Sequence, residues 1–522
     1  MNEYLAILPE ISLLVVLVFV LGADRFVAED NRRQVGMVAA WGALVTLLIT
    51  VGVWWWYEPF NASLNSDLAT SVIWGDMLRM DMVTFVFRVM FLLSLLLTIL
   101  ISLDIEHLQR PEFYGLLVTA TIGFNLMAAS VDLVMLFVAL ETASISLYLL
   151  AGFSTAEQRS TEAGMKYFVY GAFASAVMLY GMSLLYGLTG ELTRVLGVHG
   201  INLNVVGETN IYELAQAIAA VPEMPEGMGV YFVVTCVLIL AGFAFKISAV
   251  PFHFWAPDVY EGAPTPVTAF ASTASKAAGF AVLFRVIAAG MFGSYAVPLV
   301  VEDGGAAEWW IIILAMCVFT MTIGNFAAIF QTNLKRMLAY SSVAQAGYVL
   351  IGLLSMNADG AGAAMYYLLM YVATNIVAFG VVILVSNATG ADNLEDFYGL
   401  NRRAPFLALM MLLALLSLGG IPPTAGFIGK FFIFKAAVDA GLWWLALIGI
   451  LNAFIALYYY LTVIKYMYLY DSDAADVAIP VSRAARLGLA LGGIIVLYMG
   501  TVANQAFVWT TEAASAFFAI LN

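Results

Sequence analysis

The feature that most constrains this chain is a succession of apolar stretches, each about as long as a helix needs to be to cross a bilayer. A spanning helix requires roughly 20 predominantly apolar residues, and by this rule the sequence contains roughly fourteen such stretches. Because helices satisfy their own backbone hydrogen bonds in lipid, the pattern predicts an all-α polytopic membrane protein. The predicted spans cover residues 4–22, 35–56, 82–103, 114–130, 131–153, 163–188, 229–250, 266–292, 309–330, 337–355, 361–386, 404–437, 442–470 and 487–509.

The composition supports the same class and excludes several others. Charged residues make up 11% of the 522 residues and hydrophobic residues 63%, whereas soluble domains contain about 25% charged residues. A net charge of −14 without any basic cluster argues against a nucleic-acid partner. Two cysteines are too few for a cluster or zinc motif, and no Gly-rich nucleotide fingerprint opens a βαβ unit. We therefore expect a chain embedded in the lipid bilayer, with no metal, no cofactor and no redox centre of its own.

Lys and Arg are distributed unevenly between the two predicted sides of the membrane. Loops after odd-numbered spans contain 13 of these residues, and loops after even-numbered spans contain only Arg79 and Arg194. Because basic loops stay in the cytoplasm, both termini are predicted to be external and the number of spans even. The loop 331–336 is then cytoplasmic and the loop 302–308 external. The N-terminal segment lacks the basic region and cleavage site of a signal peptide, so we expect its first span to be retained.

Two predicted spans are interrupted by proline and glycine. The seventh carries Lys246 shortly before Pro251, and the twelfth carries the sequence GGIPP before Lys430. Proline removes a backbone donor, and such breaks occur at membrane depth where protein or a cavity satisfies the backbone. Interrupted spans in corresponding positions are typical of inverted repeats. The predicted organisation is helices 1–3 in residues 1–112, a five-helix repeat (helices 4–8) in 113–292, a second, inverted five-helix repeat (helices 9–13) in 293–470, and helix 14 in 471–522.

Four ionisable residues stand alone inside long apolar stretches: Glu141, Lys246, Lys276 and Lys430. A lone charge at the bilayer centre costs about 2.5–3.5 kcal/mol even on a lenient scale. A buried Glu–Lys bridge that only registers helices would explain one pair, but three lysines with one acid leave positive charge unpaired. A desolvated lysine can hold or release a proton as a neighbouring charge moves. The four residues therefore indicate an ion or proton pathway.

The remaining ionisable residues have less specific patterns. His253 follows the seventh span close to the predicted cytoplasmic surface, where it is either a relay at a proton-uptake funnel or a packing residue of the loop. Asp258 and Glu261 are interpreted as solvated loop charges. Arg285 lies near a span end, where a long side chain can extend to the interface. Arg88 lies deeper, and both helix anchoring and a functional role remain open for it.

Six motifs, in order along spans five to thirteen, carry a resemblance to a known family. They are LFVALE ending at Glu141, EAGMKYFVYGAFASA, GFAFKISAVPFHFWAPDVYEGAPTPV, TASKAAGFAVLFRV, NLKRMLAYSSVAQAGY and LSLGGIPPTAGFIGKF. The chain resembles the antiporter-like membrane subunits of respiratory complex I, and among them subunit N of bacterial NADH:quinone oxidoreductase. The B-type homologue of cyanobacteria and plastids is similar too. The first three spans resemble the family only in hydropathy.

The resemblance implies a fourteen-helix fold with two inverted five-helix repeats and broken helices 7 and 12. It also implies roles for the buried charges. Glu141 is the acid that pairs with Lys246, Lys276 is the central lysine, and Lys430 is the lysine on the exit side.

The eleventh span departs from the pattern of some relatives, which carry a histidine there. This chain has none at that place, and its polar groups in the span include Tyr371 and Thr374. We therefore expect the link between Lys276 and Lys430 to run through water and hydroxyl groups, with these two side chains as candidate relays.

The resemblance further implies a proton-translocating subunit of an NADH:quinone oxidoreductase in the bacterial plasma membrane. NAD, FMN, iron–sulfur clusters and quinone would be bound by partner subunits, and the neighbouring antiporter-like subunits of the membrane arm would be the direct partners. Moving one charge against 100 mV requires about 2.3 kcal/mol, which no site in this chain releases. The alternatives are a subunit of an Mrp-type cation/proton antiporter and a purely structural scaffold.

Overall fold

The computed structural model of the chain is helical almost throughout, and it describes residues 3–23, 25–28, 31–56, 72–198, 209–214, 228–288, 308–471 and 479–521. The longer helices are α2 (Leu8–Ala23), α3 (Arg33–Trp56), α4 (Met82–Ser102), α5 (Pro111–Ala129), α6 (Leu133–Ala151), α7 (Gln158–Val198), α9 (Met228–Ile247), α12 (Lys276–Ala288), α13 (Glu308–Ile329), α14 (Leu334–Leu354), α15 (Ala358–Thr389), α17 (Pro405–Gly419), α18 (Ala425–Asp439), α19 (Trp443–Leu469), α20 (Arg483–Thr501) and α21 (Ala503–Leu521). The short elements are α1 (Glu3–Ala6), β1 (Val72–Ile73), β2 (Leu78–Arg79), η4 (Glu106–Leu108), α10 (Trp255–Gly262), α11 (Thr265–Phe270), the π-helical η5 (Ala271–Ser275), η6 (Leu394–Phe397) and α16 (Leu400–Arg403).

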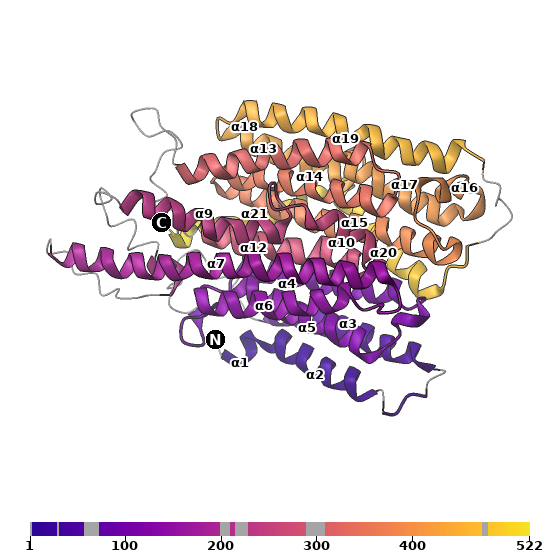
Figure 1. Ribbon diagram of the computed structural model, residues 1–522, viewed down its shortest axis with the longest axis horizontal. Coiled ribbons are helices and arrows are strands. Elements are labelled where there is room, and N and C mark those ends of the chain that lie inside the picture. Colours follow the sequence, from indigo (N-terminus) through magenta and orange to yellow (C-terminus); the bar gives the residue numbers. More distant parts are fainter. Residues whose placement is uncertain are drawn as a thin grey trace.

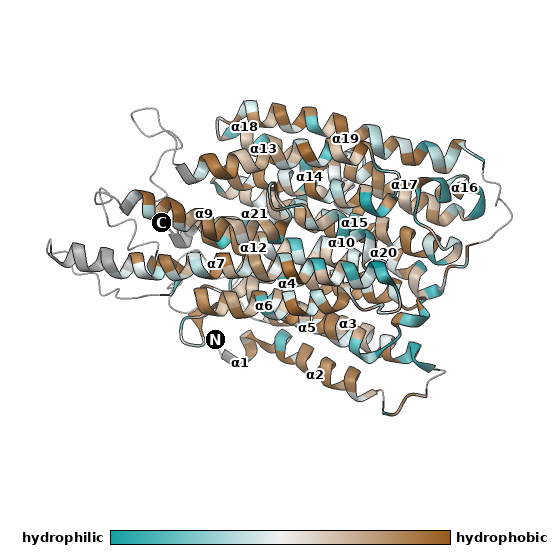
Figure 2. Ribbon diagram, viewed as in Figure 1, coloured by the Kyte–Doolittle hydropathy of each residue, from teal (hydrophilic) through white to brown (hydrophobic). Residues whose placement is uncertain are grey.

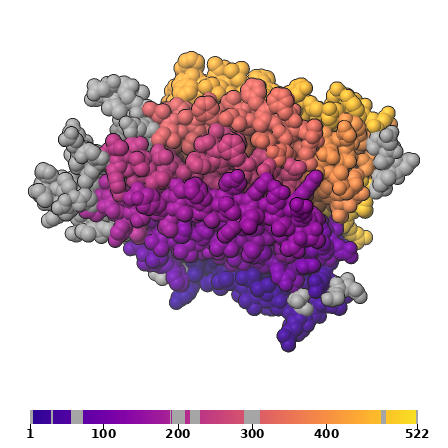
Figure 3. All heavy atoms as spheres, in the orientation of Figure 1, coloured from indigo at the N-terminus to yellow at the C-terminus, as the bar shows by residue number. Residues whose placement is uncertain are grey.

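The helices form one bundle in which most of them run side by side (Figure 1). The chain crosses the bundle from α2 at one edge to α18 and α19 at the opposite edge, and the same order is visible on the surface (Figure 3). Hydrophobic residues cover most of the helix lengths, while hydrophilic residues gather near helix ends such as those around α16 (Figure 2). This distribution is the one expected of a bundle whose sides face lipid and whose ends face water.

Among the described residues, 12 helices are long and apolar enough to cross a membrane, and α2 and α17 are shorter apolar helices. The chain is therefore an all-α polytopic membrane protein, as the sequence predicts. Each of the predicted spans contains at least one of these helices. The number of membrane crossings stays a prediction.

Side-chain caps in the local sequence determine where several helices begin. The carboxylate of Asp132 accepts a hydrogen bond from the backbone amide of Met135 at 2.8 Å and starts α6. Asn333 accepts one from the amide of Arg336 at 3.0 Å and starts α14. Such caps satisfy amides that have no partner within the helix. The helices that carry the candidate residues therefore start at positions that their own sequences specify.

The centre of the bundle is α15. Every residue from Gly360 to Val385 is buried, and the helix packs against α4, α14, α17, α18, α20 and α21. A helix that is hydrophobic all round is one surrounded by protein or lipid. Because α15 is surrounded by protein, its polar side chains face other helices.

Helix ends lie beside the prolines and glycines of the two stretches predicted as interrupted spans, but broken helices 7 and 12 stay a prediction. α9 ends at Ile247 before α10 begins at Trp255, and α17 ends at Gly419 before α18 begins at Ala425. Gly420 closes α17 with a left-handed φ of 81°, a conformation that glycine adopts without steric cost. The division into repeats at 113–292 and 293–470 stays a prediction, and its boundary lies outside the described residues.

The C-terminal region contains more helix than the sequence predicts. The predicted span 487–509 lies across the junction of α20 and α21, which only Val502 separates. α21 packs against α4 and α15, so neighbouring helices support a segment whose own composition did not predict a span.

Arg285 corrects a sequence-based expectation. Its side chain does not extend to the interface, because the residue is only 1% exposed. Two of its nitrogens donate to the carboxylate of Asp81 at 2.9 and 2.7 Å, and Nε donates to the carbonyl of Ala128 at 2.6 Å. The planar guanidinium matches a carboxylate in this forked geometry. The residue therefore joins α12 to the start of α4 and the end of α5.

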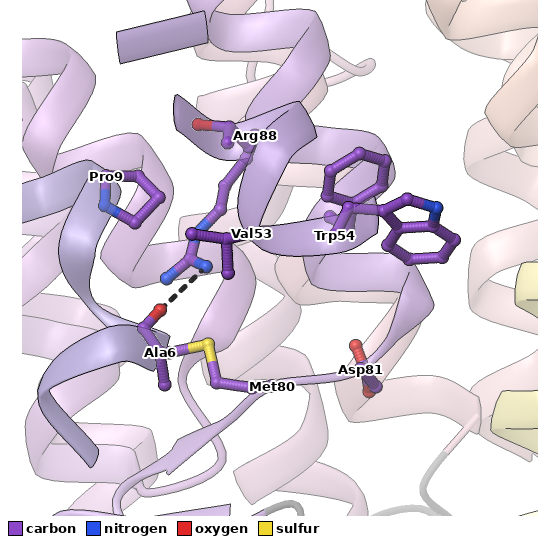
Figure 4. A pocket seen from close by; sticks show the side chains of 9 residues that line it. Ala6, Pro9, Val53, Trp54, Met80, Asp81 and Arg88 are labelled. Atoms are coloured by element: carbon purple, nitrogen blue, oxygen red, sulfur yellow. Dashed lines mark hydrogen bonds between the residues drawn. The ribbon is translucent and has the colours of Figure 1, made fainter. Parts of the chain in front are cut away.

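Arg88 anchors the N-terminal helices. Its guanidinium donates to the carboxylate of Glu10 at 2.9 Å and to the carbonyl of Ala6 at 3.1 Å, beside a small cavity (Figure 4). Both charged side chains are buried. Of the two roles that the sequence left open, helix anchoring accounts for every contact of Arg88.

Candidate functional site

Lys246 lies in the last turn of α9 and is 4% exposed. Its Nζ donates to the hydroxyl of Ser144 on α6 at 2.9 Å. The C-terminal end of a helix carries partial negative charge, which favours an ammonium group there. The C-terminal end of α9 and the hydroxyl of Ser144 together stabilise the ammonium group of Lys246.

Glu141 lies one helical turn before Ser144 on α6 and is partly buried. Within the described part of the chain, it forms no direct ion pair with Lys246, and its Oε1 is buried without a hydrogen-bond partner. The direct pairing that the resemblance implies is therefore absent, and Ser144 is the group on α6 that contacts the lysine. A buried carboxylate oxygen of this kind usually finds a partner in water or a proton donor.

Lys276 is the first residue of α12, directly after the π-helical η5, and is 2% exposed. Its Nζ donates to the carbonyl of Ser342 on α14 at 2.7 Å. Gly279 lies one turn further along α12, and a Cβ atom added to this glycine would be only 3.2 Å from Cγ of Lys246. α12 thus packs directly against the stem of Lys246. Short π-helical segments are frequent at functional sites, and this one positions the central lysine.

His253 lies in the loop between α9 and α10. Its side chain is 4% exposed, and its role as a relay or as a packing residue stays a prediction. Burial lowers the pKa of His253 below its ordinary value, and the charge of Lys276 lowers it further, although a backbone contact with Pro251 opposes both. These effects favour the neutral imidazole, and the contribution of Lys276 links His253 electrostatically to the central lysine.

The polar groups of α15 connect η5 with α17. The side-chain amide of Asn375 donates to the hydroxyl of Ser272 at 2.8 Å and to that of Tyr371 at 3.1 Å. The hydroxyl of Thr374 lies 3.0 Å from that of Ser417 on α17. Tyr371 and Thr374 were candidate relays from the sequence, and the structure places both of them between the helices of Lys276 and Lys430.

Lys430 is 5% exposed and lies one turn into α18. Its Nζ donates to the carbonyls of Leu418 at 2.8 Å and Gly419 at 3.2 Å, which are the last carbonyls of α17. The ammonium also lies 4.8 Å from the ring centroid of Tyr348. Carbonyls at a helix end have no partner in the helix, and an aromatic face attracts a cation. A Cβ on Gly420 would lie 2.9 Å from Cδ of this lysine, so glycine leaves the space that the side chain occupies.

Gln345 on α14 supports this site, and the sequence did not reveal it. Its amide nitrogen donates to the carbonyl of Leu418 at 3.3 Å and to the hydroxyl of Tyr460 at 3.1 Å, and its oxygen accepts a hydrogen bond from Tyr367. Gln345 thereby joins α14, α15, α17 and α19 beside Lys430. No sequence signal marked it, because a single amide in an apolar helix has no characteristic spacing.

The acids of α10 are partly exposed, as expected, but both are held in ion pairs. Asp258 binds Lys166 at 2.9 Å and Arg336 at 2.8 Å, and Glu261 binds Arg336 at 2.9 Å. Burial alone would raise the pKa of Asp258, but hydrogen bonds from the two cations lower it below its ordinary value. These contacts join α10 to α7 and α14 and hold the segment that follows His253.

The described residues contain no group of three or more His, Cys, Asp or Glu side chains that could hold a metal ion. Cys236 and Cys317 are both free and buried. What the structure brings together is a row of ionisable and polar side chains on adjacent helices, most of them buried.

Comparison with known proteins places this arrangement in a family. Residues 130–456 match the family model described as NADH:quinone oxidoreductase/Mrp antiporter, TM. The protein named NADH-quinone oxidoreductase subunit N from Heliobacterium modesticaldum is 40% identical, over 94% of this chain and 94% of its own length. The chain belongs to the subunit N family.

Solved structures agree with the subunit N family. A chain of respiratory complex I from Thermus thermophilus superposes with a TM-score of 0.73 at 29% identity, covering 96% of this chain and 98% of that one. A chain of the Mrp complex from a Dietzia species has a TM-score of 0.79 at 20% identity and covers 100% of both chains. That second similarity shows the fold alone, so subunit N is supported better than the Mrp alternative.

Proposed function

We propose that this chain, as the antiporter-like subunit N of an NADH:quinone oxidoreductase, moves protons across the membrane. Quinone reduction in other subunits drives the movement. The observation that carries the proposal is the row of polar side chains on adjacent helices, which runs from the partly buried Glu141 through the buried Lys246, Lys276 and Asn375 to Lys430. Such residues inside a membrane bundle mark ion or proton pathways.

The first half of the pathway runs from α6 to α12. Lys246 is held by Ser144, so a change in the charge of Glu141, one turn away, alters how firmly the ammonium is bound. A proton released there passes to Lys276, on the helix packed against the stem of Lys246. His253 is the candidate relay on this side, because it is buried within electrostatic reach of Lys276.

The second half runs across α15 to the break between α17 and α18. Asn375 joins Ser272 and Tyr371, and Thr374 joins Ser417. Water bridges the gaps between these hydrogen-bonded groups. Lys430 receives the proton at the carbonyl end of α17 and delivers it towards the external face.

In this proposal the chain is one subunit of a translocating enzyme and binds no redox cofactor itself. NAD, FMN, iron–sulfur clusters and quinone belong to partner subunits, and the chain assembles in the membrane arm beside other antiporter-like subunits. The solved relative from Thermus thermophilus is part of a respiratory complex I, which supports this assembly. An Mrp-type subunit would instead exchange cations without any quinone reduction, and that difference is measurable.

Glu141→Gln and Lys246→Ala are each expected to slow proton transfer through the chain by about 100-fold, because each removes a group that gives or takes a proton. Proton translocation per quinone reduced, measured in proteoliposomes that contain the intact complex, tests this. Thr142→Val is the matched control, since Thr142 is adjacent to Glu141 and its hydroxyl bonds only to its own helix, at Val138. Normal pumping by both test variants in a fully assembled complex would remove these residues from the pathway.

The orientation of the bundle is part of the proposal: a bacterial plasma-membrane protein with both termini outside. Figure 1 draws the two ends of the chain at the same end of the bundle, which supports termini on one side. A cysteine at Gln331 should react with a membrane-impermeant reagent from the cytoplasmic side, and one at Glu308 from the external side. The rest of the loop 302–308 lies outside the described residues. Reversed labelling would overturn the predicted topology, and the buried native cysteines leave a low background.

A further inference from the structure

An apolar groove lies between α3, α4 and α20, away from the residues of the proton pathway. Its volume is about 500 Å³. Its floor is made of buried residues of α3 and α4, and its rims are exposed residues of α3 and α20. The floor includes Ala40, Leu96 and Leu103, and the rims include Met37, Trp41 and Leu487. The rim side chains are large, apolar and exposed, so the mouth of the groove is lined by groups that suit contact with lipid.

Two arginines stand together at one end of this groove. Arg33 is the first residue of α3 and Arg483 is the first residue of α20. Arg33 makes one contact of 3.3 Å with Asp104 and stays 49% exposed. Arg483 forms no ion pair within the described part of the chain and is exposed. Among the described residues, the guanidinium groups of Arg33 and Arg483 have one paired carboxylate, Asp104, so the described lining carries net positive charge and donors suited to a phosphate.

The depth of the groove matches one leaflet of a bilayer. From Arg33 to Leu44, which lines its deep end, α3 advances by about 16 Å at 1.5 Å per residue. Half of the hydrocarbon core is about 15 Å. Both arginines follow predicted cytoplasmic loops, so the charged end lies at the headgroup level of that leaflet and the apolar walls lie at the level of its acyl chains.

We infer that this groove is a binding site for one anionic phospholipid of the cytoplasmic leaflet. Its phosphate lies between Arg33 and Arg483, and one acyl chain lies along the wall formed by α3, α4 and α20. The bound lipid fills the space between the N-terminal helices and α20 and holds them together. The inference does not depend on the proton pathway, because none of its residues belongs to that pathway.

Photolabelling of the purified complex tests the site. The complex is placed in nanodiscs that contain phosphatidylglycerol with a diazirine on one acyl chain, and labelled peptides of α3 and α20 are quantified by mass spectrometry. Labelling should fall about 30-fold in Arg33→Gln/Arg483→Gln, since each arginine near the headgroups contributes about a fivefold preference. Arg483→Gln alone should lower it about fivefold, and it disturbs no ion pair among the described residues. Diacylglycerol with the same diazirine, which lacks the phosphate, should label these peptides weakly and equally in all variants.

Arg159→Gln is the matched control, because Arg159 is exposed on the same predicted side and does not line the groove. Its labelling should equal that of the wild type. Unchanged labelling in the double variant would overturn the proposal, as would equal labelling by the neutral probe. A photo-cross-linker placed at Trp41 on the rim gives a further check. If it links the groove to a neighbouring subunit, the occupant is a protein and the proposal is overturned.

Discussion

Lys430→Met is expected to slow proton transfer through this chain by about 100-fold or more, which is the range for losing a positioned proton-transfer group. Methionine is similar in size but cannot carry a proton. It also removes the donor to the carbonyl of Gly419 and one of the two side-chain donors to the carbonyl of Leu418, which keeps Gln345. Among the charged groups of α18, Lys430 is the buried one, whereas Lys435 and Asp439 pair at the exposed end.

The control and the rescue for Lys430 come from the same helix. Lys435→Met removes an exposed lysine and should leave translocation unchanged. Lys430→Glu should retain part of the activity, because a carboxylate can also carry a proton at this position. Proton translocation and quinone reduction are measured together in proteoliposomes. If Lys430→Met pumps like the wild type, the side chain only fills space and the proton leaves by another route.

Asp81→Ser is expected to destabilise the chain by about 3–5 kcal/mol, which is the usual effect of removing one partner from a buried ion pair. Asp81 caps α4 through the amide of Thr84 and accepts both nitrogens of Arg285. Serine can keep the cap, so the loss reports the missing carboxylate, chiefly at Arg285 and also at the buried Arg79, whose Nε lies 3.8 Å from Asp81. The measurement is the denaturation midpoint of the purified complex together with the yield of assembled complex.

Two further variants separate the causes of that loss. Asp81→Ser/Arg285→Met removes the forked pair and should recover part of the stability, because Arg285 no longer leaves an unpaired charge, whereas the buried Arg79, 3.8 Å from Asp81 in the native chain, still lacks its carboxylate. Asp439→Ser breaks the exposed pair with Lys435 and should leave stability nearly unchanged. A single Asp81 variant as stable as the wild type would show that the pair does not hold α12 against α4.

The class of the protein and its buried lysines followed from the sequence because both depend on local properties. The length of an apolar stretch and the cost of a charge within it are properties of a short segment. Lys246, Lys276 and Lys430 were selected on that basis, and the structure buries all three. α9 ends at Ile247 and α17 at Gly419, close to the prolines and glycines of the sequence, while the broken helices themselves stay a prediction.

The tertiary structure alone decided which groups these lysines contact. Ser144, the carbonyl of Ser342 and Gln345 come from distant segments of the chain, and hydroxyls or amides in apolar helices most often bond only to their own backbone. The partner of Arg285 was also decided by the tertiary structure. Its position near a span end predicted an exposed side chain, but the fold places Asp81 beside it. The lengths of the apolar stretches and the charges within them therefore determined the class of the protein and its candidate residues. Helix packing, which no short segment encodes, determined which groups those buried residues contact.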